Sequence, residues 1–224
     1  MNISNLIQTV LIYALPVLFA ITIHEAAHGY VARALGDNTA YAMGRVTLNP
    51  LKHIDPVGTI LMPLMLYFAT GGTFLFGYAK PVPVNFGQLR RPKRDMIWVA
   101  LAGPASNLIQ ALLWAVLFAV LRFSGVEERF FLIMALAGVL VNLVMWAFNL
   151  FPLPPLDGGR ILVGLLPWRA ANALSRVEPW GFFIVLGLVL LGVVGAYWLL
   201  PLIKLGYLAL DLLNLPTPFP PRLR

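Results

Sequence analysis

Long apolar runs separated by short polar segments dominate the chain. Four of these runs, at about 6–35, 96–121, 130–150 and 180–200, hold twenty or more residues. A helix of that length crosses a hydrocarbon core of about 30 Å, because each residue adds about 1.5 Å. The pattern therefore predicts an all-α membrane protein, built as a polytopic helical bundle.

A fifth apolar run, 57–69, is too short for this role. Its thirteen residues would reach only about 20 Å as a helix, and Pro56 and Pro63 interrupt it. If it crossed the bilayer, the Lys and Arg residues would divide equally between the two sides. If it dips in and returns, the segments 33–94 and 151–179 share one side, and only Arg122 and Arg129 lie opposite before the run at 180–200. Because positive residues concentrate on the cytoplasmic side, the charges favour a re-entrant segment.

The stretch 74–86 has a different pattern from the predicted helices. Short β-prone pieces alternate with Gly77, Pro81 and Pro83, and proline confines such pieces to sheet edges. We expect a small membrane-associated β element here. Residues 216–224 are rich in Pro and Arg and are expected to form a flexible tail. Residues 1–215 then form a single domain, since no linker or repeat divides them.

Composition agrees with a bilayer environment. Hydrophobic residues make up 60% of the chain and charged residues 11%, and the mean hydropathy of +0.83 argues against a water-soluble enzyme. The absence of cysteine excludes disulfides, thiolate metal sites and cysteine nucleophiles. The net charge of +7 is interpreted as attraction to anionic lipid headgroups. Binding of nucleic acid is not favoured, because the chain lacks a soluble face on which nucleic acid could bind. Residues 1–8 contain no Lys or Arg, so we interpret the first run as part of the mature protein.

The sequence His24-Glu25-Ala26-Ala27-His28 lies inside the first predicted span. On a helix, residues four apart stand one above the other, so both imidazoles can reach one metal ion. Glu25 is turned by about 100° from His24, beside the metal but not forced to bind it. That position suits a base that takes a proton from water. Ionisable residues are costly within a membrane and mark functional sites.

A catalytic zinc ion needs a third protein ligand. Asp157 is favoured, because it follows three prolines in a segment that cannot continue a helix. Irregular backbone at membrane depth occurs only where protein or a water-filled cavity covers it. If 57–69 is re-entrant, the spans at 6–35 and 130–150 run in the same direction, and Asp157 comes to the same face as the histidines. The other candidates in the sequence are His53, Asp55, Asp37 and Asp95.

These motifs resemble those of a known family. HEAAH in the first span, together with Asn149-Leu150-Phe151-Pro152-Leu153-Pro154-Pro155-Leu156-Asp157-Gly158-Gly159, is similar to the site-2 protease family of intramembrane zinc metalloproteases. The segments 44–56 (GRVTLNPLKHIDP) and 102–107 (AGPASN) resemble its compact prokaryotic branch. The resemblance covers nearly the whole chain.

The resemblance implies an activity and a site. The activity is hydrolysis of a peptide bond within or near the transmembrane segment of a single-span membrane protein, known as regulated intramembrane proteolysis. One Zn²⁺ ion would be bound by His24, His28 and Asp157, with Glu25 as general base and Asn149 near the substrate or the developing oxyanion. The location would be a prokaryotic inner membrane, with the active site toward the cytoplasmic side.

The sequence leaves alternative roles for several residues and alternative functions for the protein. His53 can be a gate, an accessory substrate contact or a structural histidine, and the structural or gating role is favoured over a ligand role. Asn107 and Asn142 are expected to bridge helices. The 74–86 stretch can pair with an unwound substrate strand. The competing functions are a membrane zinc carrier or sensor that does not hydrolyse its partner, and a scaffold with a purely structural zinc ion.

Overall fold

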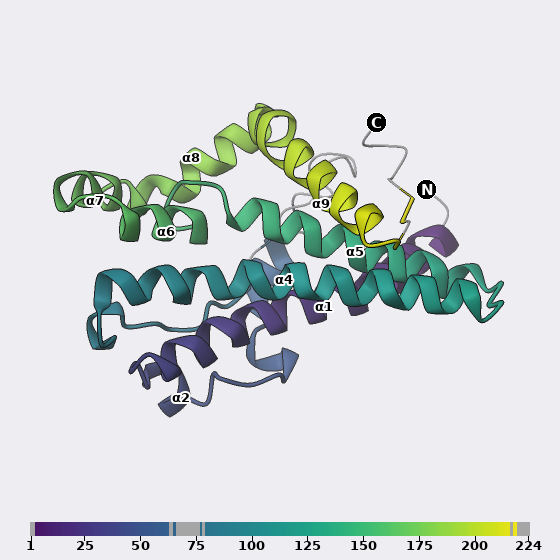
Figure 1. The fold of residues 1–224 in the computed structure, drawn as a ribbon, viewed down its shortest axis with the longest axis horizontal. Helices are drawn as coiled ribbons and strands as arrows, with labels where there is room; N and C mark the ends of the chain where they lie inside the picture. The colour runs from purple at the N-terminus through teal and green to yellow at the C-terminus, as the bar shows by residue number, and fades with distance from the viewer. Residues whose placement is uncertain (1–2, 63–64, 66–76, 78, 216, 219–224) are drawn as a thin grey trace.

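Three long helices form the body of the protein. The computed structural model describes residues 3–62, 65, 77, 79–215 and 217–218. Helices α1 (Ile3–Ala34), α4 (Pro92–Phe123) and α5 (Arg129–Asn149) pack against one another and run side by side (Figure 1). They cover the predicted runs 6–35, 96–121 and 130–150. Each is long and apolar enough to cross a membrane.

The short helices gather at one end of this bundle. α2 (Thr39–Ala42), α6 (Asp157–Leu165) and α7 (Trp168–Ser175) lie there, while the turn between α4 and α5 lies at the opposite end, near the N-terminus (Figure 1). α6 packs against α4. The basic residues before and at the start of α4 therefore share an end with those of α6 and α7, and Arg122 in the last turn of α4 lies at the other end. This is the uneven distribution of charge that the sequence indicates.

The predicted run 180–200 is not one helix. α8 (Glu178–Leu190) ends before Gly192, which has a φ of 75°. Glycine adopts this left-handed conformation at no steric cost, so the helix stops there. After the π-helix η4 (Gly195–Leu199), the chain continues as α9 (Leu200–Leu212), which packs against α5. α7 and α8 are bent by 67° and together form a candidate fourth span.

The main core lies between α4, α5 and α9. Trp114, Val139, Leu143, Ile203 and Tyr207 are buried in it. Large apolar side chains elsewhere face outward, among them Phe123, which is 93% exposed. An apolar exterior of this kind is expected of a protein surrounded by lipid.

The predicted β element is not found among the residues that the structure describes. The 3₁₀-helix η1 (Pro50–Lys52) lies well before this stretch, and residues 79–85 run as irregular chain up to the 3₁₀-helix η3 (Phe86–Gln88). Pro81 and Pro83 have no N–H to donate to a ladder, and side chains hold this segment instead. Residues 74–76 and 78 lie outside the described residues.

Two other predicted segments fall largely outside the description. Of the predicted re-entrant run 57–69, the structure describes residues 57–62 and 65, and the π-helix η2 (Pro56–Leu61) covers its start. Of the predicted tail 216–224, it describes only residues 217 and 218.

Candidate metal centre

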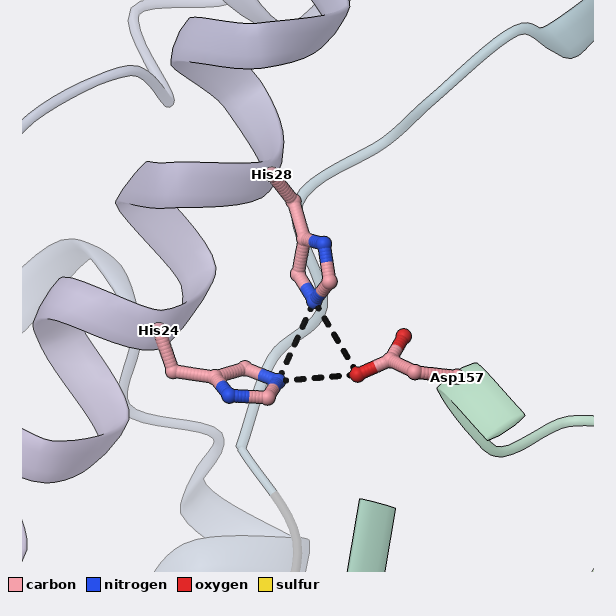
Figure 2. A group of neighbouring side chains, drawn as sticks. All are labelled: His24, His28 and Asp157. Atoms are coloured by element: carbon pink, nitrogen blue, oxygen red, sulfur yellow. Dashed lines mark hydrogen bonds and ion pairs between the residues drawn. The ribbon is translucent and has the colours of Figure 1, made fainter. Parts of the chain in front are cut away.

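Three buried side chains point toward one another at the end of the bundle that carries α6 (Figure 2). His24 and His28 project from one face of α1, and their Nε2 atoms lie 3.1 Å apart. Asp157, the first residue of α6, places its Oδ2 atom 3.3 Å from each of these nitrogens. The three residues are 4–9% exposed. In the described part of the chain this is the only group of three such side chains that can hold a metal ion.

Helix α4 orients both imidazoles from behind. The Nδ1 atom of His24 lies 2.7 Å from Oδ1 of Asn107, and that of His28 lies 2.7 Å from the carbonyl oxygen of Val99. The carbonyl of Val99 can only accept a hydrogen bond, and the amide nitrogen of Asn107 is directed at Asn142 and Ala20. Each Nδ1 is therefore placed to donate a hydrogen bond to α4, which leaves each Nε2 directed at the centre, as binding of a metal ion requires.

The donor set fits a metal cation. Two imidazole nitrogens and a carboxylate oxygen converge within 3.3 Å of one another, and Oδ2 of Asp157 is buried without a further hydrogen-bond partner. Bringing lone pairs together in this way is unfavourable unless a cation balances them. Ligands about 2.0–2.1 Å from a tetrahedral zinc ion lie about 3.3 Å from one another. The observed separations of 3.1–3.3 Å match one face of such a tetrahedron.

A glycine of α4 makes room for the two histidines. A Cβ atom at Gly103 would lie 2.4 Å from Nε2 of His28 and 2.6 Å from Cε1 of His24. Real Cβ atoms do not approach other atoms so closely, so any other residue here would displace the imidazoles. The space beside the ligands therefore depends on the absence of a side chain at this position.

Asp157 is held by a different arrangement. The chain between α5 and α6 is a proline-rich turn, against which glycines pack with no room for a side chain. A Cβ at Gly159 would lie 2.0 Å from the nitrogen of Pro154, and a Cβ at Gly181 of α8 would lie 1.7 Å from the carbonyl oxygen of Pro154. The turn is thus pressed between α6 and α8, and this fixes where α6 begins.

The other predicted candidates for a third ligand bind backbone groups instead. Asp37 accepts from the N–H groups of Thr39 and Asn85, Asp55 from those of Val57 and Gly58, and Asp95 from that of Arg91. Nε2 of His53 lies 2.9 Å from the carbonyl oxygen of Thr47. None of them joins the group of His24, His28 and Asp157.

Glu25 and Asn149 line the same small cavity as the three converging side chains. This cavity of about 90 Å³ is also lined by Arg160. One oxygen of Glu25 accepts a hydrogen bond of 2.7 Å from the backbone N–H of Val82. The side-chain amide of Asn149 donates to the carbonyl of Met145, one turn earlier in α5. A second cavity, of about 890 Å³, also reaches His24, Glu25 and Asn149 and is lined mainly by apolar side chains of α1, α5 and α8.

Several contributors were not predicted from the sequence. Val99 contributes its backbone carbonyl, and Gly103 contributes the space left by its missing side chain. Neither contribution can be predicted from the residue type. Arg160 follows Asp157 by three residues, and this helical spacing would have placed it on the same side of α6. The predicted bridging amides are confirmed, because Asn107 of α4 donates to Asn142 of α5 at 2.9 Å.

The buried His-His-Asp group, with both histidines on a helix long and apolar enough to cross a membrane, defines a candidate intramembrane metal site. Comparisons agree with this class. The chain is 39% identical over 198 residues to "Putative zinc metalloprotease YwhC" of Bacillus subtilis (strain 168), which covers 84% of both chains. It is 31% identical to the proteins named "Putative zinc metalloprotease Rip2" of Mycolicibacterium smegmatis, over 77% of this chain and 64% of that relative, and of Mycobacterium tuberculosis (strain H37Rv), over 83% and 71%.

The chain belongs to the site-2 protease family, as its motifs indicate. No family model matches the sequence. No solved structure matches it.

Proposed function

We propose that this protein is an intramembrane zinc endopeptidase, which hydrolyses a peptide bond within or near the transmembrane segment of a single-span membrane protein. The observation that carries the proposal is the convergence of two imidazole nitrogens and a carboxylate oxygen at one cavity that also receives Glu25. His24, His28 and Asp157 would hold one Zn²⁺ ion. Membership of a family whose relatives are named zinc metalloproteases supports the same conclusion.

Glu25 would serve as the general base. A zinc ion at this site supplies positive charge that polarises the scissile carbonyl and acidifies a water molecule. The carboxylate of Glu25 takes a proton from the attacking water as the new C–O bond forms. It then gives that proton to the leaving amine as the C–N bond breaks. Glu25 adjoins a ligand in the sequence and lines the cavity, so it needs no large movement for either transfer.

Asn149 would bind the substrate or stabilise the developing oxyanion. Its amide donates one N–H to Met145, which fixes its orientation, and a second N–H of the same amide is available for a carbonyl oxygen. A pre-oriented donor is effective because it needs no reorganisation during the reaction.

The cavity of about 890 Å³ is the proposed substrate-binding site. It lies between α1, α5 and α8 and shares His24, Glu25 and Asn149 with the small cavity. Its apolar lining suits a segment that arrives from the bilayer, and the polar groups at its end suit an exposed peptide bond. A single-span membrane protein is the partner that fits both features.

Charge sets the proposed orientation. The end of the bundle with α2, α6 and α7 carries most of the basic residues, so we place it on the cytoplasmic side of a bacterial inner membrane. Residues 57–69 would then be re-entrant, which brings α1 and α5 into the same direction and Asp157 beside the histidines. Residues 1–215 act as a single protease domain in this proposal.

The test is cleavage by the purified protein in liposomes, with a panel of single-span membrane proteins as substrates. We expect the zinc-loaded wild-type protein to cleave at least one of them, a chelator to stop cleavage and added zinc to restore it. Glu25→Gln should keep its zinc and lose activity. Zinc uptake into liposomes that survives in Glu25→Gln, without cleavage by either protein, would instead establish the zinc carrier. Unfolding on zinc removal, again without cleavage, would establish a structural ion.

A further inference from the structure

A short segment of chain lies across the proposed base. We call residues 80–85 the strap. Its central residue, Val82, is 7% exposed and donates its backbone N–H to Oε2 of Glu25 at 2.7 Å. Since this hydrogen bond occupies one carboxylate oxygen, the other oxygen of Glu25 is the one that can accept and release a proton. The strap therefore sets the orientation of the side chain on which the proposed reaction depends.

The strap is stiff and closely seated on α1. Pro81 and Pro83 flank Val82, and each proline fixes its own φ and restricts the residue before it to extended conformations. A Cβ at Gly29 would lie 2.9 Å from Val46 and 3.2 Å from Val82. The glycine thus allows the strap to approach α1 one turn beyond Glu25.

Buried charged side chains hold the strap near both of its ends. Arg45, only 8% exposed, donates from Nη2 to the carbonyl oxygens of Lys80 at 2.9 Å and Pro81 at 3.3 Å. Asp37, only 1% exposed, accepts from the N–H of Asn85 at 2.7 Å. Hydrogen bonds to charged groups are stronger than neutral ones, and these are shielded from water.

Arg45 itself belongs to a fixed loop. His53, in the same loop, accepts a hydrogen bond from the N–H of Lys80 at 2.9 Å through its backbone carbonyl, and its ring is bonded to the carbonyl of Thr47. The first peptide units of the strap are therefore clamped between Arg45 and His53. This arrangement gives a role to the 44–56 motif that the metal site does not use.

We propose that Arg45 is a positioning residue for peptide hydrolysis, acting through the strap on Glu25. Its guanidinium group fixes the carbonyls of Lys80 and Pro81, and through them the N–H of Val82 that orients the carboxylate. The inference rests on the proposed function, since it takes Glu25 as the base. The hydrogen bonds of Arg45 go to the strap and not to the metal ligands or the base, so its effect passes along the backbone of the strap.

The first experiment separates this role from zinc binding and substrate binding. Arg45→Met, Arg45→Lys and the control Lys52→Met are compared on a substrate that the wild-type protein cleaves. Lys52 is an exposed cation in the same loop. We expect Arg45→Met to lower kcat by about 10- to 100-fold, as misplacement of reacting groups does, with KM and zinc content unchanged. Arg45→Lys, which keeps a donor, should recover most of the rate. An unchanged kcat, or a loss shared with Lys52→Met or explained by lost zinc, overturns the proposal.

The second experiment removes the hydrogen bond from the side of the strap. Val82→Pro deletes the N–H that reaches Glu25, while Val82→Ala shortens the side chain and keeps it. We expect Val82→Pro to lose as much kcat as Arg45→Met and Val82→Ala to lose much less. The double variant Arg45→Met/Val82→Pro should be no slower than either single variant, because both break the same connection. Additive losses, or equal losses in the proline and alanine variants, contradict it.

A third measurement does not depend on activity. The amide proton of Val82 should exchange slowly with solvent in the wild-type protein and much faster in Arg45→Met, with Lys52→Met as the control. Equal exchange in Arg45→Met and wild type overturns the strap mechanism even if cleavage is observed. A wild-type protein that cleaves nothing overturns the proposed protease and with it the role of Arg45 in hydrolysis, whatever the exchange shows. The two failures are therefore distinguishable.

Discussion

The metal centre is assembled from two parts that are held in different ways. His24 and His28 lie one turn apart on a continuous helix, and α4 orients each ring by one hydrogen bond. Asp157 follows an irregular turn whose position depends on close packing by Gly159 and Gly181. The first part is fixed by regular geometry and polar contacts, and the second by shape. Substitutions that affect one part only should show what each contributes.

Loss of the Asp157 carboxylate should have the largest effect. Asp157→Ala leaves two imidazoles, which do not complete a catalytic zinc site. We expect zinc to be lost on dialysis and cleavage to be abolished, with metal analysis and the cleavage assay as the measurements. Asp211→Ala, which removes an exposed carboxylate of α9, is the control and should keep both. Stoichiometric zinc in Asp157→Ala would show that the histidine pair suffices.

A substitution at Gly103 should disturb His24 and His28 and leave Asp157 in place. Gly103→Ala places a methyl group 2.4 Å from Nε2 of His28, so the imidazoles must move. We expect zinc affinity to fall by about 100-fold, measured by competition with a chelator. Gly187→Ala, where a Cβ has no neighbour within 4 Å, should bind zinc as the wild-type protein does. Equal affinity in the two variants would refute the proposed steric role.

Removal of the acceptor behind His24 should have a smaller effect. Asn107→Leu leaves the Nδ1 proton of His24 without its partner, and changes of this kind weaken metal binding by about 10- to 100-fold. Asn142→Leu keeps the bond between His24 and Asn107 and should cost less. If Asn142→Leu weakens zinc binding as much as Asn107→Leu, the effect comes from helix packing and not from orientation of the ring.

The close packing of α8 against the turn between α5 and α6 should contribute to the thermal stability of the protein. In Gly181→Ala the new methyl group meets the carbonyl of Pro154 at 1.7 Å, and overpacking costs about 1–3 kcal/mol. We expect a thermal midpoint in detergent lower by about 2–4 °C for each kcal/mol. Gly187→Ala, in the same helix, should change stability by less than about 1 kcal/mol. Identical midpoints for the two variants would mean that α8 does not press on the turn.

The same contrast explains what could be predicted from the sequence. The predicted spans at 6–35, 96–121 and 130–150, and the shared face of His24 and His28, follow from apolar length and helical period. Asp157 could be favoured because proline and glycine mark irregular chain. That Asp37, Asp55 and Asp95 accept hydrogen bonds from backbone N–H groups instead is decided by the local chain geometry around each of them.

One error has a local cause, and the other errors and omissions arise from tertiary contacts. The apolar run 180–200 gave no sign that the chain would turn at Gly192. Residues 79–85 were expected to lie in a β element, but they form irregular chain that is held by Arg45, Asp37 and Glu25. No local pattern pairs a basic residue with a carbonyl thirty-five positions away.

Helix α4 contributes no ligand, yet it contacts every part of the centre. It supplies the carbonyl of Val99, the amide of Asn107 and the space at Gly103, and Gly164 of α6 packs against its first turns. Transplanting this centre into a designed helical scaffold would therefore require more than the HEAAH and LDG segments. The graft would also have to include a third, non-coordinating helix in the correct register, because that helix defines the ring tautomers and the room available to the ion.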